Sequence, residues 1–414
     1  MNISVIGLGF VGLTTALGFA DKGFNVKGYD IDAERSAKIM NGIVPFLEPG
    51  LDEALKRTNG KEFTVVSDVE NAAKNADVIF FCVGTPCDDE GKADLKYLFS
   101  AIDSVINTVS CECVFVIKST VPPGTTSKEI IPFIRKKNNT ISIANNPEFL
   151  REGYCWNDFI KPDRIVCGCD ENDTSAIALL KTIYVLFNAP IHFVTPNTAE
   201  FIKYLSNSLL ASLISFSNEM SLIADAAGDV NIAKAFKILH QDKRLDGSGI
   251  IHYIYPGCGY GGYCLPKDTV ALSANAKVNG FVPRILDGVI SLNDEMPHLT
   301  AEKIKRNLKD KNEKIGILGL SFKPNSDDVR DSPAAKIIKI LLADGYKNIF
   351  VYDPEAIDNF KQNYKFDLNY SESKEEVCEI CDCIAIITIW KEFKEINIKY
   401  PAKQFVDCRY FLNN

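Results

Sequence analysis

The residues best suited to chemistry lie in the run Gly261-Gly262-Tyr263-Cys264-Leu265-Pro266-Lys267-Asp268. It places one cysteine in a glycine-rich loop, with a lysine and an aspartate shortly after it. The thiolate is the nucleophilic form of cysteine, and nearby positive charge favours it. Glycines let a backbone come close to a ligand. The run therefore predicts a covalent step at Cys264, although the Lys267 side chain could also point away from the thiol.

A second motif opens the chain, where Gly7-Leu8-Gly9-Phe10-Val11-Gly12 fits G-x-G-x-x-G. Alone this pattern is weak, but here it follows an apolar strand, opens a helical segment, and is followed by Asp30 after the next strand. A helix N-terminus can hold a pyrophosphate, and Asp30 can accept from ribose hydroxyls. A carboxylate there repels a 2′-phosphate, so we expect NAD rather than NADP, with Arg35 leaving the choice slightly open. Together the two motifs indicate a dehydrogenase.

Other polar groups follow predicted strands at the edge where open α/β sheets bind ligands. They are Val83-Gly84-Thr85-Pro86, the run from Lys118 through Ser119 and Thr120 to Gly124, and Asn146-Pro147-Glu148-Phe149-Leu150-Arg151-Glu152-Gly153. Each could be only a turn or a solvated loop. Lys203 and Asn207 lie four residues apart, on one face of a predicted helix, where they could stabilise an oxyanion or could be ordinary surface residues.

The elements that position these residues alternate between strands and helices, which predicts an α/β fold with parallel sheets. The predicted strands are Ile3–Ile6, Asn25–Tyr29, Val78–Cys82, Val114–Ile117, Ile141–Ala144, Arg164–Cys167, Ile191–Phe193, Asn348–Asp353, Cys383–Thr388 and Gln404–Asp407. A second βα pattern starts at Lys314, where Ile315–Leu320 resembles the opening run Val5–Phe10. The strand-and-acid pattern near Asp353 resembles that near Asp30, so we expect two Rossmann-like domains joined by a helical middle. The expected division is 1–196, 197–300 and 301–414.

A long helix is predicted over 198–227, because this segment contains neither Gly nor Pro. We expect Asn197 or Thr198 to cap its start and Gly228 to cap its end. A helix of this length can connect domains and carry a dimer face, so the sequence predicts a homodimer.

Composition excludes several classes of function. The chain has 414 residues and a net charge of −8, without a long basic run, which argues against nucleic acid or an anionic membrane as a partner. No apolar run reaches the length of a membrane helix, and Met1 leads directly into a strand without a signal peptide. We expect a soluble cytoplasmic protein. The thirteen cysteines are then reduced thiols.

One dense cysteine cluster comprises Cys378, Cys381 and Cys383. A metal site would need a fourth ligand, and no histidine lies nearby in the sequence. We therefore interpret the cluster as a helix end followed by a buried strand, and we predict no metal site.

The motifs together resemble the nucleotide-sugar 6-dehydrogenase family, and most closely its UDP-glucose type. The resemblance rests on the cysteine run, the loop from Asn146 to Gly153, Phe201-Ile202-Lys203-Tyr204-Leu205-Ser206-Asn207, Gly319-Leu320-Ser321-Phe322-Lys323-Pro324 and Ser326-Asp327-Asp328-Val329-Arg330. It extends from Met1 to about Arg409. It implies oxidation of a sugar C6 alcohol to a carboxylate, with reduction of two NAD molecules.

The resemblance also implies roles for single residues. Cys264 would form a thiohemiacetal and then a thioester, Lys203 and Asn207 would stabilise the oxyanion, and Glu148, Asp268 and Thr120 would manage protons and the hydrolytic water. The implied cofactor-binding residues are Gly7, Gly9, Phe10, Val11, Gly12, Asp30, Arg35, Gly84, Thr85, Pro86, Ser119, Thr120, Glu152, Lys267 and Arg330. The implied substrate-binding residues are Glu148, Phe149, Leu150, Arg151, Lys203, Asn207, Arg244, Tyr253, Tyr255, Gly261, Phe322 and Lys323.

Two stretches depart from the family pattern. Cys258 stands where the family often has proline or another residue, and could be a regulatory thiol or a small buried one. The stretch from Arg244 to Tyr253 is a few residues longer than the usual UDP-glucose pattern, and Gln241-Asp242-Lys243 resembles GDP-mannose dehydrogenases. GDP-mannose is therefore the alternative substrate, ahead of UDP-N-acetylmannosamine. A simple β-hydroxyacid dehydrogenase and a catalytically silent sugar-nucleotide sensor remain as other classes.

Overall fold

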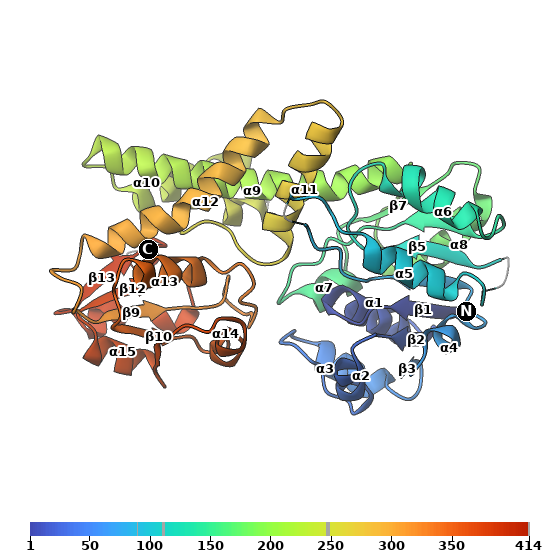
Figure 1. Cartoon of the computed structure of the whole chain (residues 1–414), viewed down its shortest axis with the longest axis horizontal. Helices are drawn as coiled ribbons and strands as arrows, with labels where there is room; N and C mark the ends of the chain where they lie inside the picture. The colour runs from blue at the N-terminus through green and yellow to red at the C-terminus, as the bar shows by residue number, and fades with distance from the viewer. Residues whose placement is uncertain (89, 110–111, 246–248, 413–414) are drawn as a thin grey trace. The chain divides into compact units, whose positions relative to one another are not determined.

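The computed structural model describes residues 1–414 except 89, 110–111, 246–248 and 413–414. The chain forms two compact units, Met1–Leu205 and Ser206–Asn414. Each unit is built around one sheet with helices packed against it (Figure 1). This confirms the predicted α/β class with two Rossmann-like sheets and a long central helix.

The sheet of the first unit has the order β3-β2-β1-β4-β5-β6-β7-β8. Its strands are parallel except at the pair β6 and β7, which is antiparallel. The strands are β1 Asn2–Ile6, β2 Asn25–Tyr29, β3 Phe63–Val65, β4 Val78–Phe81, β5 Val114–Ile117, β6 Ser142–Asn145, β7 Ile165–Cys169 and β8 Ile191–Val194. The first six strands have the order typical of a dinucleotide-binding sheet.

Helices cover both faces of this sheet, which explains why its central strands are continuously apolar. In β4, Val78 and Phe80 pack into one core, whereas Ile79 and Phe81 pack into a second core on the opposite face. The helices of the unit are α1 Phe10–Asp21, α2 Ala33–Met40, α3 Leu51–Thr58, α4 Val69–Ala73, α5 Lys96–Val105, the π-helical turn Thr126–Ile130, α6 Ile131–Arg135, α7 Cys155–Ile160, α8 Thr174–Tyr184 and the 3₁₀ turn Val185–Phe187.

The second sheet has the order β11-β10-β9-β12-β13 and is entirely parallel. Its strands are β9 Ile315–Leu318, β10 Ile349–Tyr352, β11 Asn369–Tyr370, β12 Cys383–Ile386 and β13 Gln404–Asp407. The order repeats that of the first five strands of the first sheet, as the pseudo-repeat in the sequence predicted. The helices of the unit are α10 Ile232–Leu239, the 3₁₀ turns Lys243–Leu245 and Gly249–Tyr253, α11 Cys264–Val278, α12 Arg284–Lys305, α13 Pro333–Ala343, α14 Ile357–Asn363, α15 Lys374–Ile380, the 3₁₀ turn Lys391–Phe393 and α16 Ile396–Lys399.

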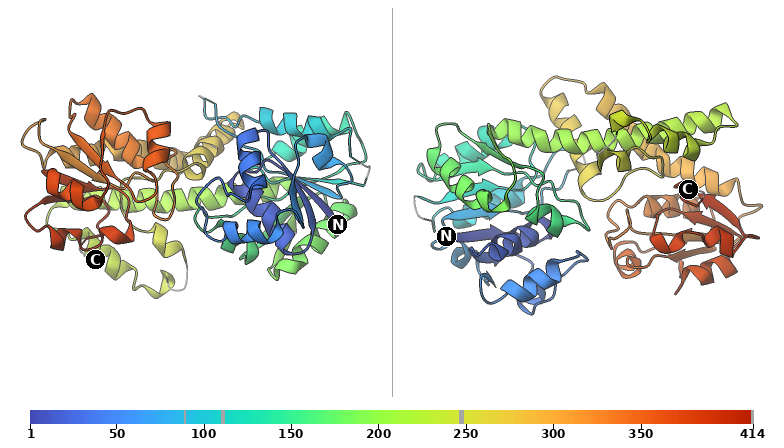
Figure 2. Two further views of the ribbon diagram at one scale, coloured as in Figure 1. Left: turned by 90° about the horizontal axis from the view of Figure 1, so that it is seen from below. Right: turned by 180° about the vertical axis from the view of Figure 1, so that it is seen from behind.

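The long helix α9 spans Pro196–Ala227 without interruption (Figure 2). Its start differs from our expectation. Thr195 precedes it, and the Thr195 hydroxyl accepts from the backbone N–H of Thr198, with Pro196 at the first helical position. Gly228 follows the helix with φ +71°, as expected for a C-terminal glycine. None of the helices in the described part of the chain, α9 included, is long and apolar enough to cross a membrane.

The cysteine cluster lies where we predicted it. Cys378 is in α15, Cys381 ends that helix, and Cys383 begins β12. All three thiols are buried, and the sulfurs of Cys378 and Cys381 belong to an apolar core with Trp390. Burial raises the pKa of each of these thiols to about 12. They act as small apolar side chains.

Asp353 ends β10 and holds the loops of the second sheet together. Its Oδ2 accepts from the backbone N–H groups of Leu320 and Ser321, from the Ser321 hydroxyl and from Trp390 Nε1, at 2.7–3.1 Å. Its Oδ1 accepts from two further backbone N–H groups, those of Glu355 and Ala356. The side chain is buried, so each of these donors depends on the carboxylate.

We predict that Asp353→Asn lowers the free energy of unfolding by about 2–4 kcal/mol, because the new amide NH₂ faces donors that then lose their acceptor. Urea unfolding followed by tryptophan fluorescence measures the effect. The exposed Asp367→Asn is the matched control and should leave the transition unchanged. Equal midpoints for the two variants would show that Asp353 is not a structural carboxylate.

Candidate active site

The three glycines of the first βα turn have three different environments. Gly7 has φ +91°, and a Cβ there would lie 2.9 Å from the backbone oxygen of Cys82. A Cβ at Gly12 would lie 1.7 Å from the backbone oxygen of Gly7, so the helix packs too closely for any side chain. A Cβ at Gly9 would meet nothing within 4 Å. The open side of Gly9 lies at the start of α1, where no side chain caps the helix, and this arrangement could hold a pyrophosphate.

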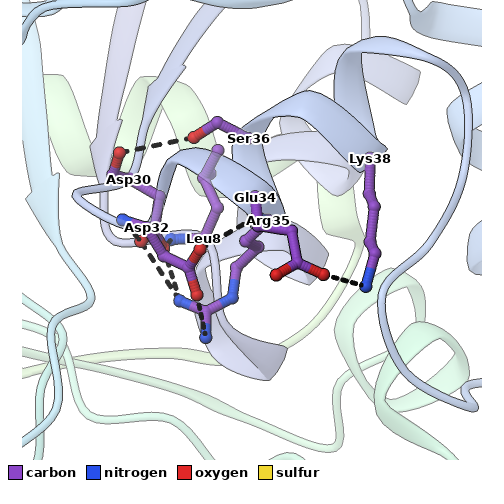
Figure 3. A network of polar contacts seen from close by, with 7 residues as sticks. All are labelled: Leu8, Asp30, Asp32, Glu34, Arg35, Ser36 and Lys38. Carbon is purple, nitrogen blue, oxygen red and sulfur yellow. Dashed lines mark hydrogen bonds and ion pairs between the residues drawn. The ribbon is translucent and has the colours of Figure 1, made fainter.

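Asp30, after β2, is buried beside this turn and carries four hydrogen bonds (Figure 3). Its oxygens accept from the backbone N–H groups of Leu8 at 2.6 Å and Asp32 at 2.9 Å, and twice from Arg35 Nη1 at 3.1 and 3.0 Å. Arg35 also lies 3.4 Å from Asp32 Oδ2. The hydrogen bond from the Arg35 backbone N–H, helped by the guanidinium charge, lowers the pKa of Asp32. The structure thus brings together two residues predicted for the cofactor and adds Asp32.

The loops after β4 and β5 are bonded to each other. Thr85 Oγ1 donates to the backbone oxygen of Thr120 at 2.7 Å, and Ser119 Oγ donates to that of Val83 at 2.6 Å. Gly84 is exposed between them. The two loops therefore form one surface at the carboxyl edge of the sheet.

Glu200 on α9 fixes the end of the second of these loops. Its two carboxylate oxygens accept from the backbone N–H groups of Gly124 at 2.6 Å and Thr126 at 2.7 Å. Burial raises the pKa of Glu200, although these N–H groups oppose the rise. Sequence reasoning missed this residue, but Glu200, Lys203 and Asn207 share the spacing of one helix face and could have been considered together.

A buried ion pair joins Lys203 and Glu148. The Lys203 ammonium lies 2.7 Å from Glu148 Oε1, and both side chains are about 95% buried, with exposed fractions of 5% and 6%. Glu148 Oε2 also accepts from the backbone N–H of Leu150 at 2.6 Å. Burial alone would raise the pKa of Glu148, but the Lys203 charge and these hydrogen bonds hold it below its ordinary value. Glu148 is therefore a carboxylate able to accept a proton next to a fixed cation.

The rest of the Glu148 loop faces different partners. The Phe149 ring lies 5.8 Å from the Lys203 ammonium and 4.3 Å from the Arg164 guanidinium. Arg151 is exposed and forms an ion pair with Asp158 at 2.6 Å. Glu152 is half-buried in the turn before α7.

Cys264 is the first residue of α11, and its side chain is exposed. A helix N-terminus favours a thiolate. Asp268, one turn later, is buried and accepts from Asn207 Nδ2 at 2.6 Å and from the Lys267 ammonium at 2.5 Å. Burial would lower the pKa of Lys267, but the Asp268 carboxylate raises it, with a smaller contribution from Cys264. Four predicted catalytic or cofactor residues thus lie together, and Lys267 points to Asp268.

The glycines before Cys264 lie close to other parts of the protein. A Cβ at Gly261 would lie 2.4 Å from the backbone oxygen of Asp331, and one at Gly262 would lie 2.8 Å from the Phe322 ring. The Gly262 N–H donates to the backbone oxygen of Arg330 at 3.0 Å. The close approach is thus made to the protein itself, because the cysteine loop packs against the segment 322–331.

That segment carries three further predicted residues of the second unit, Phe322, Lys323 and Arg330. Lys323 lies 5.3 Å above the Phe322 ring. Arg330 forms an ion pair with Asp328 at 2.6 Å and lies 4.7 Å from the ring of Tyr263, the neighbour of Cys264. Asp328 therefore orients Arg330 toward the cysteine loop.

Arg244, Tyr253 and Tyr255 lie on a different segment. Arg244 is 88% exposed and pairs with Asp242 at 2.5 Å. Tyr255 donates to the backbone oxygen of Tyr410 at 3.1 Å and packs beside Phe236. Tyr253 ends a 3₁₀ turn, and residues 246–248 of this predicted insertion lie outside the described residues.

Cys258 is a buried thiol, in line with the plainer of the two expectations. Its sulfur donates to the backbone oxygen of Cys408 at 3.7 Å. The hydrogen bond with the Cys408 side chain, helped by the Arg409 charge, lowers the pKa of Cys258.

One further buried group was missed because each member looks ordinary in the sequence. Lys118 donates to Asn146 Oδ1 at 2.9 Å, and Tyr184 donates to the same oxygen. Burial lowers the pKa of Lys118. The group ties the ends of β5 and β6 together directly before Thr120 and Glu148.

Comparison with known sequences identifies the family of the chain. Three models of the UDP-glucose/GDP-mannose dehydrogenase family match the chain in order: its NAD binding domain at residues 1–188, its central domain at 197–295 and its UDP binding domain at 316–414. The chain belongs to the UDP-glucose/GDP-mannose dehydrogenase family. The predicted family resemblance and the predicted cofactor NAD are thereby confirmed, and the protein is an oxidoreductase. The UDP binding domain indicates a sugar nucleotide as its substrate.

Individual relatives cover the chain almost completely. A UDP-glucose 6-dehydrogenase of Rickettsia conorii is 39% identical and spans 100% of this chain and 96% of its own. The structure of a UDP-glucose dehydrogenase from Pyrobaculum islandicum is similar with a TM-score of 0.93 and 35% identity, covering 99% of this chain and 94% of that one. A UDP-D-ManNAc dehydrogenase from Pyrococcus horikoshii is similar with a TM-score of 0.85 and 31% identity, covering 98% and 93%.

The buried Lys203–Glu148 pair leads to a pH-dependent prediction. Lys203→Met should destabilise the protein by about 3–5 kcal/mol at neutral pH, because Glu148 remains buried without its cation. With Lys203, the lowered pKa of Glu148 contributes stability above the unfolded pKa of about 4.3. Without Lys203, burial raises that pKa, so the variant loses stability as pH rises above about 4.3. The difference in the free energy of unfolding between wild type and variant should therefore increase from pH 4.5 to pH 8.

Thermal unfolding across this pH range measures this difference. Lys203→Met with Glu148→Gln is the control, and it should recover stability at pH 8 because neither charge of the pair remains. A difference that does not change with pH would contradict the proposed state of Glu148.

Proposed function

We propose that the protein oxidises the C6 alcohol of UDP-glucose to UDP-glucuronate, with two NAD molecules reduced for each substrate and a covalent intermediate on Cys264. The observation that carries the proposal is the exposed Cys264 at the start of α11, followed one turn later by a buried Asp268 bonded to Asn207 and Lys267. The names of the relatives from Rickettsia and Pyrobaculum support UDP-glucose as the substrate.

The first βα turn fits NAD. The open side of Gly9, the uncapped start of α1 and the carboxylate of Asp30 match a pyrophosphate and a ribose. When bound, NAD supplies the hydride acceptor for both oxidations. Thr85, Ser119 and Thr120 would line the nicotinamide side, since the loops that carry them are bonded at the same sheet edge.

In the proposed sequence, the first oxidation converts the C6 alcohol to an aldehyde. The Cys264 sulfur then forms a bond to C6, which gives a thiohemiacetal. Loss of a second hydride gives a thioester, and water breaks the C–S bond to release the carboxylate and return the thiol. Overall, one alcohol and one water give a carboxylate, two hydrides and three protons.

The side chains of this chain can hold the charges and protons of these steps. The Lys203 ammonium and the Asn207 amide would stabilise the oxyanion at C6. Glu148, kept ionised beside Lys203, would accept protons and direct the hydrolytic water with Thr120. Asp268 would hold Asn207 and Lys267 in place. The covalent bond retains the aldehyde, which would otherwise escape into water.

The proposal predicts two NADH released for each UDP-glucose consumed. Cys264→Ser should lower turnover at least ~1,000-fold and retain a bound intermediate, because an alcohol is a poor substitute for the thiolate. Absorbance at the NADH band and substrate analysis measure the ratio, with the buried Cys258→Ser as the control that should keep it. One NADH for each substrate in the wild type would favour a simple β-hydroxyacid dehydrogenase, and binding without turnover would favour a sensor.

The choice of sugar nucleotide needs its own comparison. Similarity to the Pyrococcus enzyme, whose name specifies UDP-D-ManNAc, keeps that substrate as a candidate, and the family also includes GDP-mannose dehydrogenases. We expect kcat/KM for UDP-glucose to exceed that for UDP-N-acetylmannosamine and GDP-mannose. A higher kcat/KM for either of these would replace UDP-glucose and leave the cysteine chemistry intact.

We also propose that the protein is a homodimer through α9. Leu209, Phe216 and Ile223 follow one another at seven-residue spacing, so they lie on one face of the helix, and each is about half exposed. A second copy of this chain could cover that face. The three-part division at residues 196 and 300 remains our proposal as well, supported by the ranges of the family matches.

Phe216→Asp should weaken self-association at least ~10-fold, because it places a charge in the middle of the apolar face. Sedimentation velocity over a concentration series measures this. Phe281→Asp changes another exposed apolar residue, outside α9, and should leave association unchanged. Dissociation caused by Phe281→Asp alone would place the interface elsewhere.

A further inference from the structure

The loop after β2 neutralises its own arginine. Arg35 Nη1 donates to both oxygens of Asp30, and Arg35 Nη2 lies 3.4 Å from Asp32 Oδ2 (Figure 3). Two carboxylates therefore face one guanidinium. The negative charge in this clamp exceeds the positive charge by one.

Two other donors of α2, the Lys38 ammonium and the backbone N–H of Arg35, also have carboxylate partners. The Lys38 ammonium forms an ion pair with Glu34 at 2.8 Å. The backbone N–H of Arg35, which belongs to the first turn of α2, donates to Asp32 Oδ1 at 3.0 Å. In a dinucleotide-binding sheet, this loop is where an arginine accommodates a 2′-phosphate. In this chain the arginine of the loop, Arg35, already has two carboxylate partners.

We propose that Asp32 is a specificity-determining residue, which holds Arg35 in the two-carboxylate clamp and thereby makes the site select NAD over NADP. Asp30 alone cannot do this. When its oxygens take the ribose hydroxyls, it must give up some of the hydrogen bonds from Arg35, since four hydrogen bonds from three donor groups already occupy its two oxygens. When the ribose is bound to Asp30, Asp32 is the second carboxylate that still pairs with the Arg35 guanidinium. Without it, Arg35 is free to pair with a 2′-phosphate.

Asp32 can be changed without disturbing the fold. Its side chain is 42% exposed, whereas that of Asp30 is 4% exposed and bonded to the Leu8 backbone. An ion pair as exposed as that between Asp32 and Arg35 adds little to stability. Asparagine at position 32 can still accept from the Arg35 backbone N–H and cap α2. Asp32→Asn thus removes the charge and retains the cap.

The test is direct binding of NADH and NADPH, followed by nucleotide fluorescence in the absence of any sugar nucleotide. We expect Asp32→Asn to lower the preference for NADH over NADPH about tenfold, chiefly through tighter NADPH binding. Glu34→Gln is the matched control, because it makes the same change of net charge on the same helix without touching Arg35. It should change the preference less than about twofold.

A further variant tests the role of Arg35. Asp32→Asn combined with Arg35→Met should lose the gained NADPH affinity, since no guanidinium is left to receive the phosphate. An unchanged preference in Asp32→Asn, an equal change in Glu34→Gln, or undiminished NADPH binding in the combined variant would each overturn the proposal. Because the experiment needs only the nucleotide, its outcome is independent of which sugar the protein oxidises.

Discussion

The arrangement of the candidate site in the first unit depends on two buried carboxylates that hold the first turns of α9 against the neighbouring loops. Glu148 pairs with the Lys203 ammonium, and Glu200 accepts from the backbone of the loop that follows Thr120. Removing one partner of a buried ion pair leaves an uncompensated buried charge. This lowers the stability of the fold far more than the loss of an exposed ion pair does. These contacts therefore fix the helix that carries Lys203 against the two loops that carry Thr120 and Glu148. Lys203 and Glu148 therefore come into contact only in the folded protein.

The two sheets use the same sequence device for different purposes. In both, an aspartate follows the second strand of the βα pattern and accepts from the backbone of the first βα turn. Asp30 shares its oxygens with the partly exposed guanidinium of Arg35, and we propose that a ribose replaces some of these hydrogen bonds. Asp353 is saturated by six donors from the protein, one of them the indole of Trp390. The second unit thus has the same Rossmann-like strand order, but its aspartate, Asp353, stabilises the fold.

The sequence predicted the parts of this structure that depend on local pattern. Continuous apolar runs such as Val78–Phe81 identified the central strands, and β13 lies at the predicted residues. Strand β3 was missed because Phe63-Thr64-Val65 is too short to show a pattern, and its pairing with β2 comes from tertiary packing. The start of α9 was misplaced by two positions, at 198 instead of 196, because the Thr195-Pro196 signal was not used. Motifs alone were enough to single out Cys264, Lys203 and the glycines of the first βα turn. The pairing of Lys203 with Glu148 and that of Asn207 with Asp268 could not be predicted without the fold. Glu200 was missed because its partners lie more than 70 residues away in the sequence. Asp32 and Asp328 were missed because we assigned the function of their motifs to the neighbouring arginines, Arg35 and Arg330.

The central claim is that Cys264 carries the sugar as a thioester, and peptide mass spectrometry after acid quench during turnover tests it most directly. With UDP-glucose and NAD, the account predicts that the peptide containing Cys264 gains the mass of a UDP-glucuronyl group, and that the adduct disappears after the substrate is exhausted. An adduct on another cysteine, or none on Cys264 while two NADH form for each substrate, would contradict it.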